Sequence, residues 1–517
     1  MTHIGWRAAL PGFILALAIK LRISTGIVLA VVVASYAVDV RAADVTPMKA
    51  PPAASTPKAC TDPGDFFTTD CQLSWAGITI YGTVDAGVTW QSHGTPYDPR
   101  SAVGASYLIQ KQNRSPTWSV APNALSNSTI GIKGTEPIGG GFSAVFALDA
   151  GFDPYSFRFS NGPGSVYANM NVPQNQATAY SDSSRAGQWY NGVGYVGVSS
   201  PTYGTLTVFR QNSLTLDAVF DYDPFAASYA FSPIGFQGIT CGGGNTENCR
   251  NSTSLKYRVN INNFRAAAMW QFGGYDQNNA SNGAYQFQVG GDVSPWGQGT
   301  LSFDAIFSYV RDSVSLALAP GTTDANGVPI SPFLPQIPTA TISDNSAVML
   351  VAKYTTGPLK LFAGYEHIRY MAPSDPQTAF TGIGGNFFCE GCQAINNTNI
   401  NNAAYGMNGL GNKTLQVMWV GGKYAITESL DVIAGYYHYI QDSYFGTLAG
   451  GPAPCDGSEF AQCAGTFDAV SAAIDWRFAA KWDAYLGFMF SQVNGGLASG
   501  FLQRNNFAPT AGLRFRF

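Results

Sequence analysis

The feature that most constrains the fold of this chain is a strict alternation of apolar and polar residues. Side chains on a β-strand point alternately to its two faces. In GITIYGTVDAGVTW, one face carries apolar residues and a glycine: Ile78, Ile80, Gly82, Val84, Ala86, Val88 and Trp90. The same pattern recurs elsewhere, at residues 264–272, 467–478, 482–490 and 512–517. Such strands require an apolar medium on one side and water on the other.

Lipid is the apolar medium that the composition favours. Charged residues make up 12% of the chain and aromatic residues 13%, whereas a soluble domain is roughly 25% charged. The apolar faces contain many alanines and glycines, which leave voids in the core of a soluble β-sandwich but are filled by acyl chains in a bilayer. Backbone groups in a bilayer must form their hydrogen bonds within the protein. We therefore predict an all-β fold, a transmembrane antiparallel β-barrel whose terminal strand pairs with its first strand.

The first 76 residues differ from the alternating region. Residues 1–42 contain basic Lys20 and Arg22, a short apolar run and small residues at the end, which is typical of a secretory signal peptide. Residues 43–76 begin with a proline- and alanine-rich stretch, which we interpret as a periplasmic N-terminal extension. The barrel is then expected to span residues 77–517.

The 8 cysteines fall into local pairs within glycine- or aspartate-rich connections. This spacing predicts four loop-stapling disulfides, formed in an oxidising periplasm. The predicted pairs are Cys60–Cys71, Cys241–Cys249, Cys389–Cys392 and Cys455–Cys463. The CEGC segment alone would be compatible with half a zinc site, but no second CxxC or histidine cluster accompanies it. We therefore expect neither a metal site nor a cofactor.

Several segments resemble the general porins of Gram-negative bacteria, which are trimeric outer-membrane diffusion channels. ITIYGTVDAGVTW is similar to their first strand, STIGIKGTEPIGGGFSAVFALDAGF to their second hairpin, and YVGVSSPTYGTLTVFRQ to the strand before their constricting loop. The resemblance covers about residues 77–517, and AADVTPMKAPPAASTPKAC is similar to the mature start of alphaproteobacterial porins. It implies sixteen strands and a homotrimer in the outer membrane, in contact with lipid and lipopolysaccharide. It also implies passive diffusion of small hydrophilic solutes and ions.

The resemblance places the selectivity site in the loop after GTLTVFRQ, which folds inward in this family. The matching loop, residues 212–238, contains three aspartates and no basic residue. Arg210 matches the family's arginine before the loop, but strict alternation would point it outward, so it must lie past the strand end or beyond a β-bulge. The candidate pore-constriction residues are Asp217, Asp221 and Asp223 on the loop, and Lys133, Arg210 and Arg250 on the wall. An acidic loop facing few basic residues predicts mild cation selectivity.

Two alternatives remain open at this level. A substrate-specific sugar-type porin with eighteen strands has a compatible length. An outer-membrane barrel hydrolase would need a catalytic group, and the histidines His93, His367 and His438 are accompanied by no GxSxG, P-loop or metal-ligand spacing. We therefore expect no enzymatic activity. The net charge of −4 also argues against nucleic acid as a partner.

Overall fold

The fold is that of a computed structural model, which describes most of the chain after residue 58. Contacts divide the chain into residues 1–56 and 57–517, and the fold described below belongs to the second unit. The described ranges are 59–94, 107, 109, 113–157, 192–234, 250–272, 283–295, 297–317, 338–371, 413–442, 446–448, 451–453, 465–495, 498 and 501–517.

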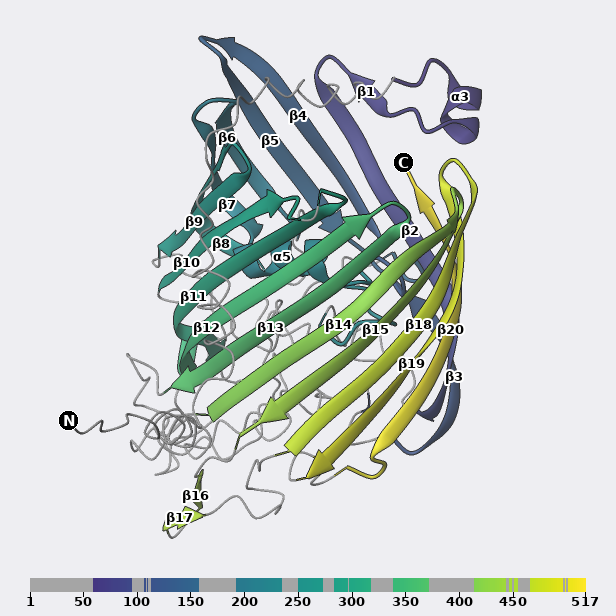
Figure 1. Cartoon of the computed structure of the whole chain (residues 1–517), viewed down its shortest axis with the longest axis vertical. Helices are drawn as coiled ribbons and strands as arrows, with labels where there is room; N and C mark the ends of the chain where they lie inside the picture. The colour runs from purple at the N-terminus through teal and green to yellow at the C-terminus, as the bar shows by residue number, and fades with distance from the viewer. Residues whose placement is uncertain are drawn as a thin grey trace, which may run out of the picture. The chain divides into compact units, whose positions relative to one another are not determined.

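One antiparallel sheet closes on itself to form a barrel (Figure 1). Its strands are β1 (Leu73–Trp75), β2 (Ile78–Gly94), β3 (Ser115–Pro122), β4 (Thr129–Gly139), β5 (Phe142–Gly151), β6 (Gly194–Ser200), β7 (Gly204–Asn212), β8 (Arg250–Ile261), β9 (Phe264–Phe272), β10 (Gly283–Val293), β11 (Thr300–Ala317), β12 (Pro338–Thr356), β13 (Leu359–Met371), β14 (Lys413–Thr427), β15 (Leu430–Gln441), β18 (Gly465–Ala479), β19 (Trp482–Gly495) and β20 (Asn505–Arg516). Two three-residue strands, β16 (Gly446–Leu448) and β17 (Gly451–Ala453), form a separate hairpin.

The barrel wall is crossed sixteen times. Strands β3 and β4 both pair with β2, one beyond the other, so they are successive halves of one crossing. Strand β1 pairs with β2 alone and adds no crossing. The predicted all-β barrel is therefore confirmed, and the alternative of eighteen strands is wrong. The predicted closure is also confirmed, because β20 pairs with β2.

The two faces of the strands differ as the alternation predicted. On β18, Val470, Ile474 and Trp476 are exposed on the outer face, whereas Ser471 and Asp475 are buried on the inner face. Among the described residues, no helix has the length and apolarity needed to cross a membrane. The connections also differ at the two ends of the barrel, since six pairs of wall-crossing strands are joined at one end by two or three residues. Short turns mark the periplasmic end of an outer-membrane barrel.

A small disulfide-closed element contacts the periplasmic end of the seam between the first and last strands. It contains α3 (Pro63–Thr68) and the Cys60–Cys71 disulfide, which confirms that predicted pair. The Phe66 ring lies edge-on to Phe515 and Phe517, with centroids 6.1 Å apart in both cases. The other three predicted disulfides lie outside the described residues.

Lys481, in the turn between β18 and β19, fastens this element to the barrel. Its Nζ donates to the Cys71 carbonyl oxygen at 2.8 Å and lies 3.9 Å from the centroid of the Phe66 ring. The lysine is almost fully buried. Its single ammonium therefore makes both a charge-assisted hydrogen bond and a cation–π contact.

We expect Lys481→Met to weaken the closed barrel by roughly 2 kcal/mol, because both contacts of the ammonium are lost. The temperature at which the folded form in detergent converts to the unfolded electrophoretic band should fall. The matched control is Lys360→Met, which removes an exposed lysine on β13. Equal transition temperatures for the two variants would contradict the role assigned to Lys481.

Candidate functional site

The candidate site is a loop that leaves the wall after β7 and lies inside the barrel. It begins with α5 (Leu214–Tyr222), which contacts β10, β11, β12 and β13 and lies within the ring of strands (Figure 1). Ser213 caps this helix, since its Oγ accepts a hydrogen bond from Leu216 N at 3.1 Å. The Leu214 amide donates to Gln286 Oε1 of β10 at 2.6 Å. The loop thus crosses from β7 toward the opposite wall.

A β-bulge precedes the loop. The register of β7 against β8 shifts between Phe209 and Gln211, and Phe209 has a φ of 87°. This is one of the two arrangements that the sequence required for Arg210. The Arg210 side chain is buried, and its Nε donates to the Gly192 carbonyl oxygen at 3.1 Å.

The first loop acid, Asp217, is held by two cations of the adjacent strand β8. Its Oδ2 lies 2.7 Å from Lys256 Nζ and also pairs with the Arg258 guanidinium. Lys256 Nζ additionally donates to the Asn212 carbonyl oxygen at 2.7 Å. The charge of Asp217 is therefore neutralised at the root of the loop, by neighbours that were not among the predicted site residues.

The second acid, Asp221, has an exposed side chain. Lys353 of β12 donates to the Asp221 carbonyl oxygen at 3.2 Å, and its ammonium lies 5.4 Å from the centroid of the Tyr222 ring. Partial desolvation raises the pKa of the Asp221 carboxyl, although the positive charge of Lys353 opposes the shift. Of the three loop acids, this one presents its charge to the lumen.

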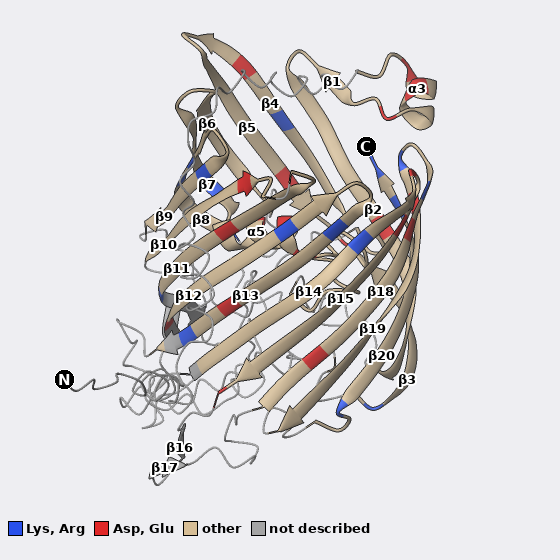
Figure 2. Cartoon of the chain, in the orientation of Figure 1, with Lys and Arg blue, Asp and Glu red and all other residues tan. Residues whose placement is uncertain are grey.

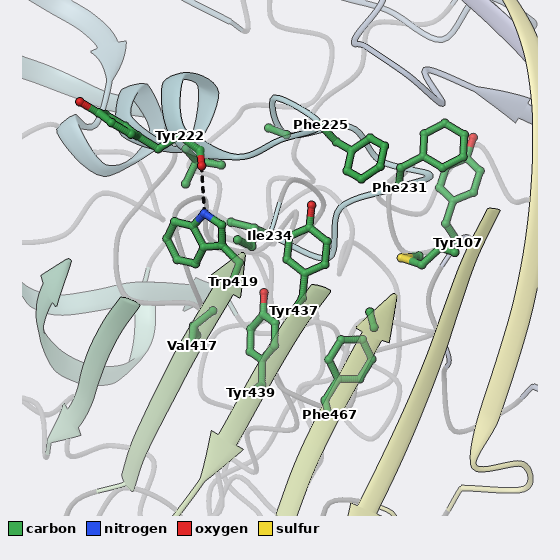
Figure 3. Close-up of a cluster of buried hydrophobic side chains, with 14 of the residues drawn as sticks. Tyr107, Tyr222, Phe225, Phe231, Ile234, Val417, Trp419, Tyr437, Tyr439 and Phe467 are labelled. Atoms are coloured by element: carbon green, nitrogen blue, oxygen red, sulfur yellow. Dashed lines mark hydrogen bonds between the residues drawn. The ribbon is translucent and has the colours of Figure 1, made fainter. Parts of the chain in front are cut away.

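The third acid, Asp223, is buried against the far wall. Its Oδ1 accepts a hydrogen bond from the Tyr437 hydroxyl of β15 at 2.6 Å, and its Oδ2 accepts one from Ala227 N at 2.8 Å. Burial raises the pKa of this carboxyl to about 6, because desolvation outweighs the hydrogen bonds to the charged form. Nearby, Trp419 Nε1 of β14 donates to the Tyr222 carbonyl oxygen at 3.0 Å (Figure 3).

Glycines on the wall make room for the loop. Gly421 of β14 and Gly435 of β15 are register partners. A Cβ on Gly421 would lie 2.6 Å from Pro224 Cγ, and a Cβ on Gly435 would lie 3.2 Å from it. On β19, a Cβ on Gly487 would lie 2.7 Å from the Phe231 ring. The loop therefore fits into depressions of the wall that larger side chains would fill.

A second inward segment meets the tip of the loop. Residues 123–128 interrupt the crossing formed by β3 and β4, and their amides surround the buried Asp85 of β2. Asp85 Oδ2 accepts from Leu125 N at 3.0 Å and from Ser126 N at 2.7 Å. The carbonyl oxygen of Ala124, in the same segment, accepts from Ser228 Oγ at 2.7 Å. Nothing in the alternation marks this interruption of the crossing, so the contact was not predicted.

A ladder of ion pairs lines the inner wall from β14 to β20. Figure 2 shows charges gathered near the ends of β18, β19 and β20 beside the C-terminus. Asp431 pairs with Lys423 at 2.7 Å and with Arg477 at 2.6 Å. Arg514 pairs with Asp483 at 2.7 Å. These residues were not predicted as site residues, although alternation already placed Arg477, Asp483 and Arg514 on the polar face.

The remaining predicted basic residues lie on the wall between β4 and β8. Lys133 is exposed, and its ammonium lies 5.2 Å from the centroid of the Tyr81 ring. Arg250 begins β8 as the register partner of Asn212. Whether either residue faces the loop acids across a constriction stays a prediction.

His438, one of the three histidines considered for an enzyme, lies on the outer face. His438 Nδ1 is 2.7 Å from Asp468 Oδ1, and Asp468 shares the lipid-facing parity of Val470 and Ile474. In the described ranges, no three His, Cys, Asp or Glu side chains are grouped as metal ligands. The lumen instead contains ion pairs, hydroxyls and an inward loop.

A closed sixteen-stranded barrel with a loop folded into its lumen defines an outer-membrane channel. A family model described as Gram-negative porin matches residues 50–496. The chain belongs to this family, and its location is the outer membrane. The family and the fold point to a channel rather than an enzyme.

Known proteins similar to the chain are distant in sequence. An outer membrane porin protein of Bordetella pertussis is 24% identical over 158 residues, which are 31% of this chain and 34% of that protein. The match thus spans about a third of the length of that relative. A solved anion-selective porin from Comamonas acidovorans is 15% identical with a TM-score of 0.51, covering 85% of this chain and 99% of that one. A loop L8 deletion mutant of OmpT, an outer membrane protein of Vibrio cholerae, is 13% identical with a TM-score of 0.50, at 85% and 99% coverage. The two structures are similar in fold alone.

The environment of Asp223 predicts a specific pH dependence of stability. A carboxyl whose pKa is raised in the folded state holds its proton between the unfolded and folded pKa values, so stability falls as pH rises from about 4 to about 6. We expect Asp223→Asn to remove this component while keeping an acceptor for Tyr437. Its thermal transition in detergent at pH 7 should equal or exceed that of the wild type.

Asp223→Ala is the informative contrast. It leaves the Tyr437 hydroxyl and the Ala227 amide without their acceptor, which should cost about 1–3 kcal/mol at every pH. A transition of Asp223→Asn as low as that of Asp223→Ala at pH 7 would show that the charged form is the stabilising one.

Proposed function

We propose that this porin forms a water-filled channel for passive diffusion of small hydrophilic solutes and ions, with mild cation selectivity. The observation that carries the proposal is the loop inside a closed barrel, with one exposed acid, Asp221, on its lumen side. A loop that narrows the lumen brings permeating ions within a few ångströms of its charges, where electrostatic preference is strongest.

The selectivity is expected to be mild because the three loop acids are not equivalent. Asp217 is paired with two cations, and Asp223 is buried with a raised pKa. Asp221 alone among them offers an exposed charge, and Lys353 lies close to it. Of the three loop acids expected to face basic residues of the wall, Asp221 is therefore the one whose charge can act on permeating ions.

We expect Asp221→Asn to shift the reversal potential measured across a KCl gradient toward the anion side. The loss of one lumen charge should change the cation-to-anion permeability ratio by a few-fold at low salt, and less at high salt, since screening acts over about 10 Å at 0.1 M. Asp217→Asn is the control that leaves Asp221 in place and frees two cations, and it should produce a larger anionic shift. An unaltered reversal potential in both variants would mean that selectivity is set elsewhere, and a wild type without ohmic conductance in planar bilayers would refute the channel itself.

We further propose that the channel assembles as a homotrimer, as the family resemblance implies. A native mass of three protomers in detergent is the expected result. A monomeric mass under conditions that preserve the folded band would contradict it.

A further inference from the structure

Part of the lumen is occupied by an apolar cluster. Strands β11–β15, β18 and β19 direct apolar side chains inward, among them Met349, Val417 and Tyr439, each buried to within 1% exposure. Phe225 and Phe231 of the loop pack against this wall, as Figure 3 shows. A hydrated solute cannot cross a region packed in this way without opening a cavity in it. Hydrophilic solutes therefore pass beside the polar parts of the wall, which are the ion pairs of β14–β20 and the opposite wall formed by β2 and β4–β8.

That opposite wall contains a polar cavity of about 400 Å³. Its lining includes hydroxyl-bearing side chains and one lysine: Thr79, Lys133, Tyr195, Ser199, Thr205 and Thr207. Ser199 Oγ and Thr205 Oγ1, on neighbouring strands, are hydrogen-bonded to each other at 2.7 Å. They form a pair of adjacent hydroxyls that retains donor and acceptor capacity for a solute. The volume suffices for a small polyol and its hydration water.

Of the described residues that line this cavity, only Lys133 carries a charge. Lys133 forms no ion pair with any described residue, and its ammonium lies over the Tyr81 ring. The acid on the neighbouring strand, Asp149, accepts hydrogen bonds from Val193 N at 2.8 Å and from the Tyr81 hydroxyl at 3.4 Å. Thr205 and Thr207 are the register partners of two further cations on β8, which share the single charge of Asp217.

We propose that this cavity is a subsite for small hydroxylated organic anions, such as sugar acids or hydroxycarboxylates, with Lys133 as the carboxylate-binding residue. The ammonium pairs with the solute carboxylate, while the hydroxyls of Ser199 and Thr205 exchange hydrogen bonds with the hydroxyls of the solute. This inference rests on the proposed channel function and names a solute class that the channel favours. It is compatible with mild cation selectivity, because small ions sense the loop acid, whereas a polyol anion contacts the wall.

The test compares a sugar acid with its uncharged analogue in proteoliposomes containing the full mature chain. Gluconate and sorbitol have the same number of carbons, so their ratio of entry rates cancels differences in insertion and pore size. Replacement of the ammonium in Lys133→Met should lower the gluconate-to-sorbitol ratio by about fivefold, the effect of one unit-charge contact near 4 Å in water. Lys133→Glu should lower it further, and Lys360→Met should leave it unchanged.

The outcomes separate this inference from the channel function. A ratio that is equal in the wild type, Lys133→Met and Lys133→Glu overturns the subsite while sorbitol entry still demonstrates a channel. A wild type that admits neither solute and shows no KCl conductance overturns the channel. A ratio lowered equally by Lys360→Met would attribute the effect to net charge and would also overturn the subsite.

Discussion

The structure depends on the backbone pairing that joins the last strand to the first. Gly82 and Phe517 exchange two backbone hydrogen bonds, of 2.9 Å and 3.0 Å, and β20 continues along β2 from Thr83 to Thr89. Without this seam, two strands would present unpaired amides and carbonyls to lipid, where water cannot satisfy them. The seam also creates the lumen, because only a closed sheet has an interior. The disulfide-closed element, through Phe66 and Lys481, covers the seam at its periplasmic end.

Closure leaves an interior wider than wall side chains can fill, and this protein fills it unevenly. The loop after β7 packs Pro224 and Phe231 against glycines of the far wall, where any Cβ would be too close. In that buried position, Tyr437 donates a hydrogen bond to Asp223, and Trp419 donates one to the backbone carbonyl of Tyr222. The apolar part of the inner wall thus fixes the loop, while hydroxyls and ion pairs line other parts of the wall.

The sequence alone predicted the fold because most strands have lipid on one face and a polar lumen on the other. Period-two alternation is a direct consequence of lipid on one face and water on the other. It also predicted that Arg210 lies past the strand end or beyond a bulge, and the structure has the bulge. Chain length alone did not choose between sixteen and eighteen crossings, but the family resemblance implied sixteen, which the structure confirms. The apolar inner wall was missed, although the continuous apolar run from Val417 to Val420 breaks the alternation and signals a strand that is apolar on both faces. The Asp85 contacts were also missed, because they depend on where the backbone leaves the sheet.

The candidate site shows why residue type alone does not define a charge that a solute can sense. Asp217, Asp221 and Asp223 lie within seven residues of one another and are chemically identical. The position of each on the loop decides its environment: two cations of β8 surround the first, the lumen surrounds the second, and Tyr437 and backbone amides surround the third. The paired Asp217 attaches the start of the loop to β8, and the buried Asp223 attaches the loop to β15. Selectivity depends on uncompensated charge, so the residues that govern it are those without a close partner of opposite charge, whichever wall they occupy.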